Sequence, residues 1–173
     1  MIIVLIGYMG SGKSSIGQKL AKVLSYDFID LDSYIESKEY LSISDIFFNK
    51  GEIYFRKKEG QYLNEVLKDS QHTVLALGGG TPCYGYNMKN ILEKDNVTSI
   101  YLKTSIPELG KRLMKEKSKR PLISHLETEE ELVEFIGKHI FERTSFYTQS
   151  NKTISTDNQT TDLIVEKIVI ELI

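Results

Sequence analysis

Short apolar segments alternate along the chain with segments whose apolar residues recur every three or four positions. Residues 2–6 form an uninterrupted apolar run, Ile-Ile-Val-Leu-Ile, which is typical of a strand buried on both faces of a parallel sheet. Further strands are predicted at 28–29, 73–77, 100–102 and 153–154. Because helical patterns separate these strands, the sequence predicts an α/β fold with a five-stranded parallel sheet.

The helical segments are recognised by the spacing of their apolar residues. In the first helix, after residue 12, these residues are Ile16, Leu20, Val23 and Leu24. Further helices are predicted at 42–48, from 51 to about 69, at 128–147 and at 161–173. Ser33 and Glu36 match the capping box that often begins a helix, and this cap leaves the two preceding aspartates free for other work.

Residues 7–14 match the phosphate-binding pattern G-x-x-x-x-G-K-[ST] between the first strand and the first helix. Glycines in this loop allow backbone N–H groups to wrap closely around phosphate oxygens. Lys13 is placed to reach the β- and γ-phosphates, and Ser14 offers a hydroxyl to Mg²⁺. The dipole of the following helix also points at the anion, so the sequence predicts that the chain binds a nucleoside triphosphate.

Two carboxylates, Asp30 and Asp32, follow the second predicted strand. Asp32 could cap the next helix, or one carboxylate could hold Mg²⁺ through water while the other accepts a proton from a substrate hydroxyl. No acidic residue closes the strand at 73–77, which leaves Asp30 as the candidate for the usual metal-binding aspartate of this class. Instead Gly78, Gly79 and Gly80 follow that strand, which suggests that a ligand approaches the backbone closely.

Two arginines lie where an anion could bind. Glu52, Arg56 and Glu59 fall on one side of a helix, either as a surface ion-pair ladder or as a rigidly held arginine that grips an anionic group with two hydrogen bonds. Arg143 interrupts the apolar stripe of the helix at 128–147. An arginine in that position needs an anionic partner, which is an internal carboxylate or the substrate.

Residues 105–124 are basic and end in Arg120-Pro121-Leu122-Ile123. A run of charge is usually a solvated helix face. Beside a phosphate-binding loop, however, a mobile segment with an arginine could close over the phosphates, exclude water and neutralise charge in the transition state.

Composition narrows the classes of partner. The 173 residues suit one domain, and a net charge of −2 gives no electrostatic reason for nucleic acid or an anionic membrane as the main partner. No apolar run approaches the roughly 20 residues that span a bilayer, and the first strand begins directly after Met1, so we expect a cytoplasmic protein. We also expect a monomer, although no sequence pattern decides the oligomeric state. The single cysteine, Cys83, and the three histidines, His72, His125 and His139, show no metal-ligand spacing and are expected to be structural.

With these residues assembled, the chain resembles the shikimate kinases over nearly its whole length. Six motifs carry the resemblance in order: Gly7 to Ser14, Asp30-Leu31-Asp32, Gly51-Glu52-x-x-Phe55-Arg56-x-x-Glu59, Gly78-Gly79-Gly80, Arg120-Pro121-Leu122 and Arg143-x-x-x-Tyr147. The resemblance implies the three-layer α-β-α fold of the nucleoside monophosphate kinases. It also implies ATP-dependent phosphorylation of the 3-hydroxyl of shikimate, a step toward chorismate and the aromatic amino acids.

The resemblance also implies roles for individual residues. Lys13, Asp32 and Arg120 are the implied catalytic residues, with Asp32 binding the attacking hydroxyl and Arg120 acting from a mobile lid at about 111–125. The implied ATP contacts are Gly10, Ser11, Gly12, Lys13, Ser14, Ser15, Arg112 and Arg120. The implied shikimate contacts are Asp32, Arg56, Gly78, Gly79, Gly80 and Arg143. Ser14 and Asp30 are the implied Mg²⁺ site.

Two departures and three rival hypotheses accompany the resemblance. Ser15 stands where threonine is common, and the loop at 156–159 lacks an arginine that some relatives carry near adenine, for which Arg112 is a candidate substitute. A kinase for another polyol acid such as gluconate shares the ATP chemistry but gives no reason for the triple glycine and Arg143 together. A regulatory module that only binds nucleotide has no need for the acceptor base Asp32, and no N-K-x-D guanine motif supports a GTPase.

Overall fold

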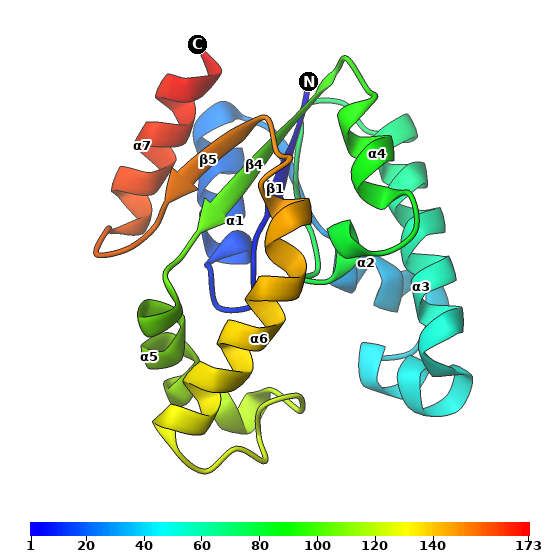
Figure 1. The fold of residues 1–173 in the computed structure, drawn as a ribbon. Helices are drawn as coiled ribbons and strands as arrows, with labels where there is room; N and C mark the ends of the chain where they lie inside the picture. The colour runs from blue at the N-terminus through cyan, green and yellow to red at the C-terminus, as the bar shows by residue number, and fades with distance from the viewer.

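The computed structural model describes residues 1–173, with only the backbone of residue 119. Five strands form one parallel sheet in the order β2-β3-β1-β4-β5, which confirms the predicted fold class. The strands are β1 (Ile2–Ile6), β2 (Asp27–Asp30), β3 (Thr73–Ala76), β4 (Val97–Lys103) and β5 (Lys152–Ser155). Their carboxyl ends all lie at one end of the molecule, and both chain termini lie at the other (Figure 1).

Helices cover both faces of the sheet and make three layers (Figure 1). Helices α1 (Lys13–Leu24) and α7 (Thr161–Leu172) pack on one face. The other face is covered by α2 (Leu31–Glu39), α3 (Ile43–Asp69), α4 (Asn87–Leu92), α5 (Ile106–Glu116) and α6 (Glu129–Tyr147). Short 3₁₀ turns, η1 (Thr81–Cys83) and η2 (Lys117–Lys119), follow β3 and α5.

The apolar run of β1 is explained by its position at the centre of the sheet. Ile2, Val4 and Ile6 join the core beneath α2 to α6, whereas Ile3 and Leu5 join the core beneath α1 and α7. All five side chains are fully buried. A central parallel strand must be apolar on both faces, so the period-2 alternation of a half-exposed strand is absent from this segment.

Helix α3 changes direction at Gly51, where the sequence predicted the boundary between two helices. Gly51 adopts φ 83° and ψ 169°, a conformation that residues with a Cβ rarely adopt. The elements on either side are helical, so the two predicted helices meet here without a loop. The bend separates the short first part of α3 from the longer part that carries Arg56.

Two local predictions were wrong. Helix α2 begins at Leu31, not after Ser33: Asp30 is its N-cap and accepts a hydrogen bond from Ser33 N at 3.2 Å. Glu36, the expected partner in a capping box, instead accepts from Ile43 N at 2.8 Å. Val23 is 56% exposed, although its spacing placed it on the buried stripe of α1.

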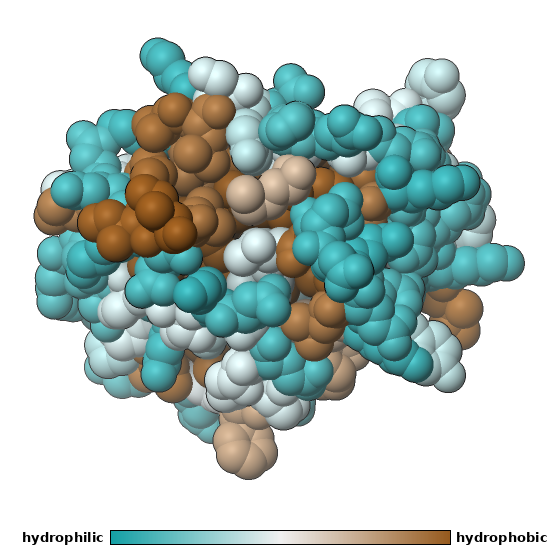
Figure 2. Space-filling view, turned by 90° about the horizontal axis from the view of Figure 1, so that it is seen from above, coloured by the Kyte–Doolittle hydropathy of each residue, from teal (hydrophilic) through white to brown (hydrophobic). Residues whose placement is uncertain are grey.

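The end of the molecule that carries the termini has an apolar area on the side where α7 lies, and mostly polar side chains elsewhere (Figure 2). Apolar residues of α1 and α7 line a shallow groove on the surface, among them Val23, Val169 and Ile170. None of the helices in the described part of the chain is long and apolar enough to cross a membrane.

Candidate active site

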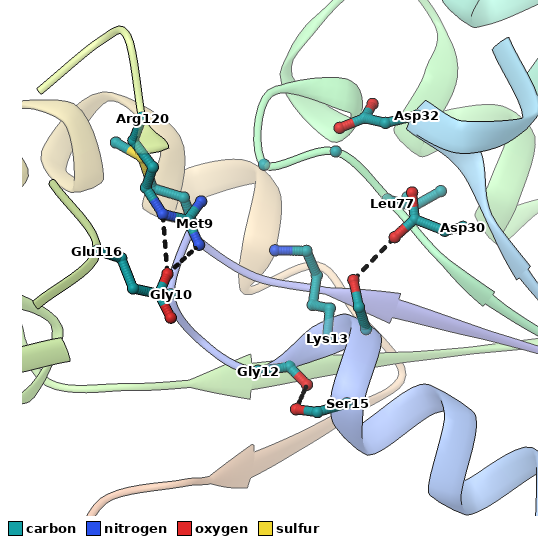
Figure 3. Close-up of a pocket in the computed structure, with 13 residues that line it drawn as sticks. Met9, Gly10, Gly12, Lys13, Ser15, Asp30, Asp32, Leu77, Glu116 and Arg120 are labelled. Atoms are coloured by element: carbon teal, nitrogen blue, oxygen red, sulfur yellow. Dashed lines mark hydrogen bonds and ion pairs between the residues drawn. The ribbon is translucent and has the colours of Figure 1, made fainter. Parts of the chain in front are cut away.

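A pocket of about 360 Å³ opens at the carboxyl end of the sheet. Its floor is the loop between β1 and α1, and its walls come from Asp30, Asp32 and residues 77–79 on one side and from Glu116 and Arg120 on the other. Lys13 lies between the two walls (Figure 3). The pocket therefore brings together residues from four of the six motifs that the sequence analysis singled out, and the motifs that carry Arg56 and Arg143 contribute no lining residue.

The phosphate-binding loop is built as its sequence predicts. Gly12 caps α1 in a left-handed conformation with φ 92°, so the first N–H groups of the helix point into the loop. Lys13 Nζ donates to the carbonyls of Gly7 and Tyr8 at 2.8 and 2.9 Å, which holds the ammonium group at the centre of the loop. Burial lowers the pKa of Lys13 to about 8, against the opposing charge of Asp32.

Ser15 and Ser11 are both expected to contact the nucleotide, but only Ser15 lines the pocket. Ser15 lines the pocket, and its hydroxyl donates to Gly12 O at 3.1 Å. Ser11 is fully buried and its backbone N–H donates to Tyr8 O at 3.2 Å, so its N–H is engaged within the loop.

Asp30 joins the loop to the start of α2. Its Oδ2 accepts a hydrogen bond from the Ser14 hydroxyl at 2.8 Å, and its Oδ1 caps α2. The two residues predicted to hold Mg²⁺ are thus in direct contact. In the described part of the chain no group of three or more His, Cys, Asp or Glu side chains forms a metal site.

Asp32 lies in the first turn of α2 and is left free, because Asp30 supplies the cap. Burial is the main cause that raises the pKa of Asp32 to about 6, and the charges of Asp30 and Glu59 add to the effect while Lys13 opposes it. A carboxylate with a pKa near neutrality is suited to accepting a proton during catalysis.

The triple glycine is explained by the side chains that lie against it. A Cβ on Gly78 would come within 2.9 Å of Asp32 Oδ1, and a Cβ on Gly80 within 3.0 Å of Arg56 Nη2. A Cβ on Gly79 would lie 3.5 Å from Arg143 Nη1. The segment therefore gathers the carboxylate and both arginines around one stretch of bare backbone.

The structure has features of both interpretations of the helix that carries Arg56, the ion-pair ladder and the rigidly held arginine. Its Nη1 donates to Glu59 Oε2 at 2.9 Å, and its Nε lies 3.6 Å from Glu52 Oε1, so the predicted ladder exists. Glu59, however, is only 1% exposed, and its other oxygen accepts from the Thr81 hydroxyl at 2.7 Å. The ladder is anchored in the core and points Arg56 at the glycine segment, as a binding site requires.

Arg143 and Tyr147 reach the same segment from α6. The fully buried Tyr147 donates its hydroxyl to Gly79 O at 2.6 Å. Ion pairs of arginines in the described part of the chain involve Arg56, Arg112 and Arg120, and none involves Arg143. The internal carboxylate considered for Arg143 is therefore absent from the ion pairs of the described residues.

Arg120 and Arg112 stand on the nucleotide side. Arg120 donates to Glu116 Oε2 through Nη2 and Nε, at 2.7 and 3.1 Å (Figure 3). Arg112 lies in an adjoining pocket of about 520 Å³ and donates to the carbonyls of Gly10 and Thr156 at 3.3 and 3.2 Å. It thereby connects the phosphate-binding loop with the loop at 156–159.

Sequence reasoning missed Thr81, which supports Glu59, and Glu116, which pairs with Arg120. The signal for Glu116 was present, because it precedes Arg120 by four residues in a basic segment where an acidic residue stands out. No local pattern connects Thr81 with Glu59, since they are 22 residues apart in different elements.

The parallel sheet, the phosphate-binding loop and the adjoining arginines define a P-loop kinase of the nucleoside monophosphate kinase type. The family model for shikimate kinase matches residues 9–173. A shikimate kinase of Flavobacterium johnsoniae is 48% identical over 96% of this chain and 96% of its own length. The chain belongs to the shikimate kinase family.

Solved structures agree with this assignment. The crystal structure of the Bacteroides thetaiotaomicron shikimate kinase superposes with a TM-score of 0.90 and 31% identity, covering 99% of this chain and 98% of that one. The Acinetobacter baumannii shikimate kinase, whose structure is a complex with shikimate, superposes with a TM-score of 0.85 and 31% identity, covering 99% and 92%.

Proposed function

We propose that this chain transfers the γ-phosphoryl group of ATP to the 3-hydroxyl of shikimate, giving shikimate 3-phosphate and ADP. One observation supports this most directly: Asp32, Arg56 and Arg143 converge on the backbone of residues 78–80, beside a phosphate-binding loop. A small acid with ring hydroxyls needs this combination of cations for its carboxylate and a base for one hydroxyl. Membership of the shikimate kinase family identifies the acid.

Arg56 and Arg143 bind the carboxylate of shikimate in this proposal. Two guanidinium groups at one site hold a carboxylate through several charge-assisted hydrogen bonds and fix its orientation. Gly79 lies between them and offers its backbone to the ring hydroxyls, with Gly78 and Gly80 on either side. Fixing the acceptor in this way supplies much of the catalysis, because phosphoryl transfer depends chiefly on in-line positioning.

Asp32 orients the attacking hydroxyl and accepts its proton. Its raised pKa makes the carboxylate a base of suitable strength, and its position on the pocket wall faces the phosphate loop. Lys13 and Arg120 then stabilise the negative charge that spreads over the transferred group. The N–H groups of Gly10, Gly12 and Ser15 contact the phosphates, and Arg112 lies along the base of ATP.

Ser14 and Asp30 fit a magnesium ion. Mg²⁺ prefers oxygen ligands and commonly binds through one or two protein groups together with substrate phosphates and water. The hydroxyl and carboxylate oxygens, 2.8 Å apart, offer such a pair without a larger cage of carboxylates. When bound there with ATP, the ion would offset part of the negative charge of the phosphates.

The segment at about 111–125 acts as a lid in this proposal. It carries Arg120, and Ile123 near its end is fully buried and anchors the segment to the core. Closure of the lid would exclude water, which competes with shikimate as the acceptor. The monomer and the cytoplasmic location expected from the sequence remain predictions.

The proposal is tested by ADP release with ATP, Mg²⁺ and shikimate, alongside gluconate and a reaction without acceptor. Release that requires shikimate is expected, and Arg143→Ala should raise the KM for shikimate by at least about tenfold through loss of a charge-assisted contact. Lys138→Ala is the matched control, because Lys138 lies on the same helix with a side chain that is 75% exposed. Turnover with gluconate alone would overturn the choice of acceptor, and binding of ATP without turnover would favour a regulatory module.

A further inference from the structure

The ring of Tyr84 stacks on the guanidinium group of Arg56, with Cζ 3.8 Å from the ring centroid. Tyr84 directly follows the 3₁₀ turn η1, and the family motifs discussed above do not include it. We propose that Tyr84 is a positioning residue that holds Arg56 in the orientation needed to bind the carboxylate of the acceptor. This inference rests on the proposed function, in which Arg56 contacts that carboxylate.

Hydrogen bonds alone leave the orientation of Arg56 incompletely fixed. Its Nη1 has a short bond to Glu59, but its Nε is buried and has no hydrogen-bond partner among the described residues. The ion-pair partner of Nε is Glu52 Oε1 at 3.6 Å, and the Glu52 side chain is 56% exposed. A guanidinium group held strongly at one nitrogen can still turn about that bond.

Stacking on Tyr84 removes this freedom because it fixes the plane of the guanidinium group. Arginine stacks flat on an aromatic ring, and the attraction is stronger where the contact is partly shielded from water. The ring is itself held, since the Tyr84 hydroxyl donates to Glu52 Oε1 at 3.2 Å and η1 begins at the buried Thr81. Tyr84 therefore connects Arg56 with Glu52, and Thr81 of the same turn holds Glu59 at the other end of the ladder.

The position of the ring also limits how an anion can approach. One face of the guanidinium group is covered by Tyr84, and Gly80 lies close to Nη2. A carboxylate must therefore bind in the plane of the group, which is the geometry of a two-bond contact. Covering the face with an apolar ring also excludes water, which strengthens those hydrogen bonds.

The test compares Tyr84→Leu, which removes the ring, with Tyr84→Phe, which keeps the ring and removes only the bond to Glu52. Steady-state kinetics should show that Tyr84→Leu raises the KM for shikimate roughly three- to tenfold, with kcat and the KM for ATP changed less than twofold. Tyr84→Phe should restore most of the lost affinity. Tyr86→Leu is the matched control, because Tyr86 lies two residues further on and is 75% exposed.

An effect that is merely structural would lower the melting temperature or the active fraction, and would therefore reduce kcat without a selective change in one KM. That outcome overturns the inference, as does a KM for shikimate within twofold of the parent in Tyr84→Leu. A Tyr84→Phe variant that is as defective as Tyr84→Leu would also overturn the inference.

Arg56→Lys separates this inference from the proposed function. Lysine keeps the charge but presents no plane to stack, so the shikimate KM should rise in Arg56→Lys, and adding Tyr84→Leu should change it less than twofold further. If Arg56→Lys leaves the KM unchanged, the carboxylate site itself is wrongly assigned. If Tyr84→Leu repeats its full effect in the Arg56→Lys background, Tyr84 acts elsewhere and the inference fails alone.

Discussion

Arg120 and Glu116 form an ion pair, with 2.7 Å between Nη2 and Oε2, on the wall of the nucleotide pocket. Glu116 is the last residue of α5, and Arg120 follows the 3₁₀ turn that extends this helix. The pair holds the guanidinium group beside the phosphate-binding loop (Figure 3). Any phosphate that binds Arg120 must compete with this carboxylate.

We therefore expect Glu116→Gln to lower the KM for ATP about two- to fivefold. Exposed ion pairs contribute roughly 0.2–1 kcal/mol, and the side chains of this pair are 34% and 51% exposed, so a larger change is not expected. Glu134→Gln, on α6 with a side chain 68% exposed, is the matched control. A higher KM for ATP in Glu116→Gln would instead mean that Glu116 assists nucleotide binding.

Arg120→Ala should reduce turnover far more than it weakens shikimate binding. The guanidinium group lies on the nucleotide side of the pocket and is proposed to neutralise charge that develops only during transfer. Removal of a catalytic arginine should cost at least about a hundredfold in kcat, with the KM for shikimate nearly unchanged. A raised KM with unchanged kcat would assign Arg120 to ground-state binding.

The pH dependence of kcat/KM should be bell-shaped. Protonation of Asp32, with its pKa of about 6, lowers the rate toward acid pH, and loss of the proton from Lys13, with its pKa of about 8, lowers it toward alkaline pH. Bound phosphates stabilise charged Lys13, so the alkaline limb of kcat should lie at higher pH than that of kcat/KM. Initial rates at subsaturating and saturating ATP between pH 5 and 10 test this directly; coincident alkaline limbs would contradict it.

Asp32→Asn should lower kcat by about 10²- to 10⁴-fold and yet stabilise the protein at pH 7. The pKa of Asp32 is 3.8 in the reference state and about 6 in the fold, so the wild-type protein loses stability as the pH rises from about 4 to about 6. The upper limit of this loss is about 3 kcal/mol, which corresponds to a melting temperature higher by several degrees in the variant. The difference between the two proteins should disappear near pH 4; if it persists there, another cause stabilises the variant.

Much of the architecture could be predicted because it depends on local patterns. The apolar run of β1, the loop at 7–14 and the break at Gly51 each have a signal within a few residues. The cap of α2 was assigned wrongly because Ser33 and Asp30 both offer suitable side chains, and only the path of the chain leaving β2 decides between them.

The contacts that orient the site residues could not be predicted in the same way. Thr81 meets Glu59, and Tyr84 meets Arg56, only because η1 packs against α3. These pairs bring together residues that are 22 or more positions apart, and such contacts leave no periodic signal in a single sequence. Motifs therefore predict which side chains bind, whereas the fold was needed to show what holds them in place.

The side chains of Asp32 and Thr81 fill the space beside Gly78, so a side chain at this position has little room. A Cβ there would lie 2.9 Å from Asp32 Oδ1 and 3.0 Å from the Thr81 hydroxyl, so one of these groups must move in Gly78→Ala. Thr81 is buried and bonded to Glu59, so we expect the Asp32 carboxylate to be displaced. A displacement of about 1 Å can cost roughly a hundredfold in rate. We expect kcat to fall by about that amount while the Kd for ATP, measured by calorimetry, stays within threefold.

Gly137→Ala is the control, because a Cβ at this position on α6 would meet only Ile106 at an ordinary 3.9 Å. Wild-type kcat in Gly78→Ala would show that the carboxylate has room to move without loss of function.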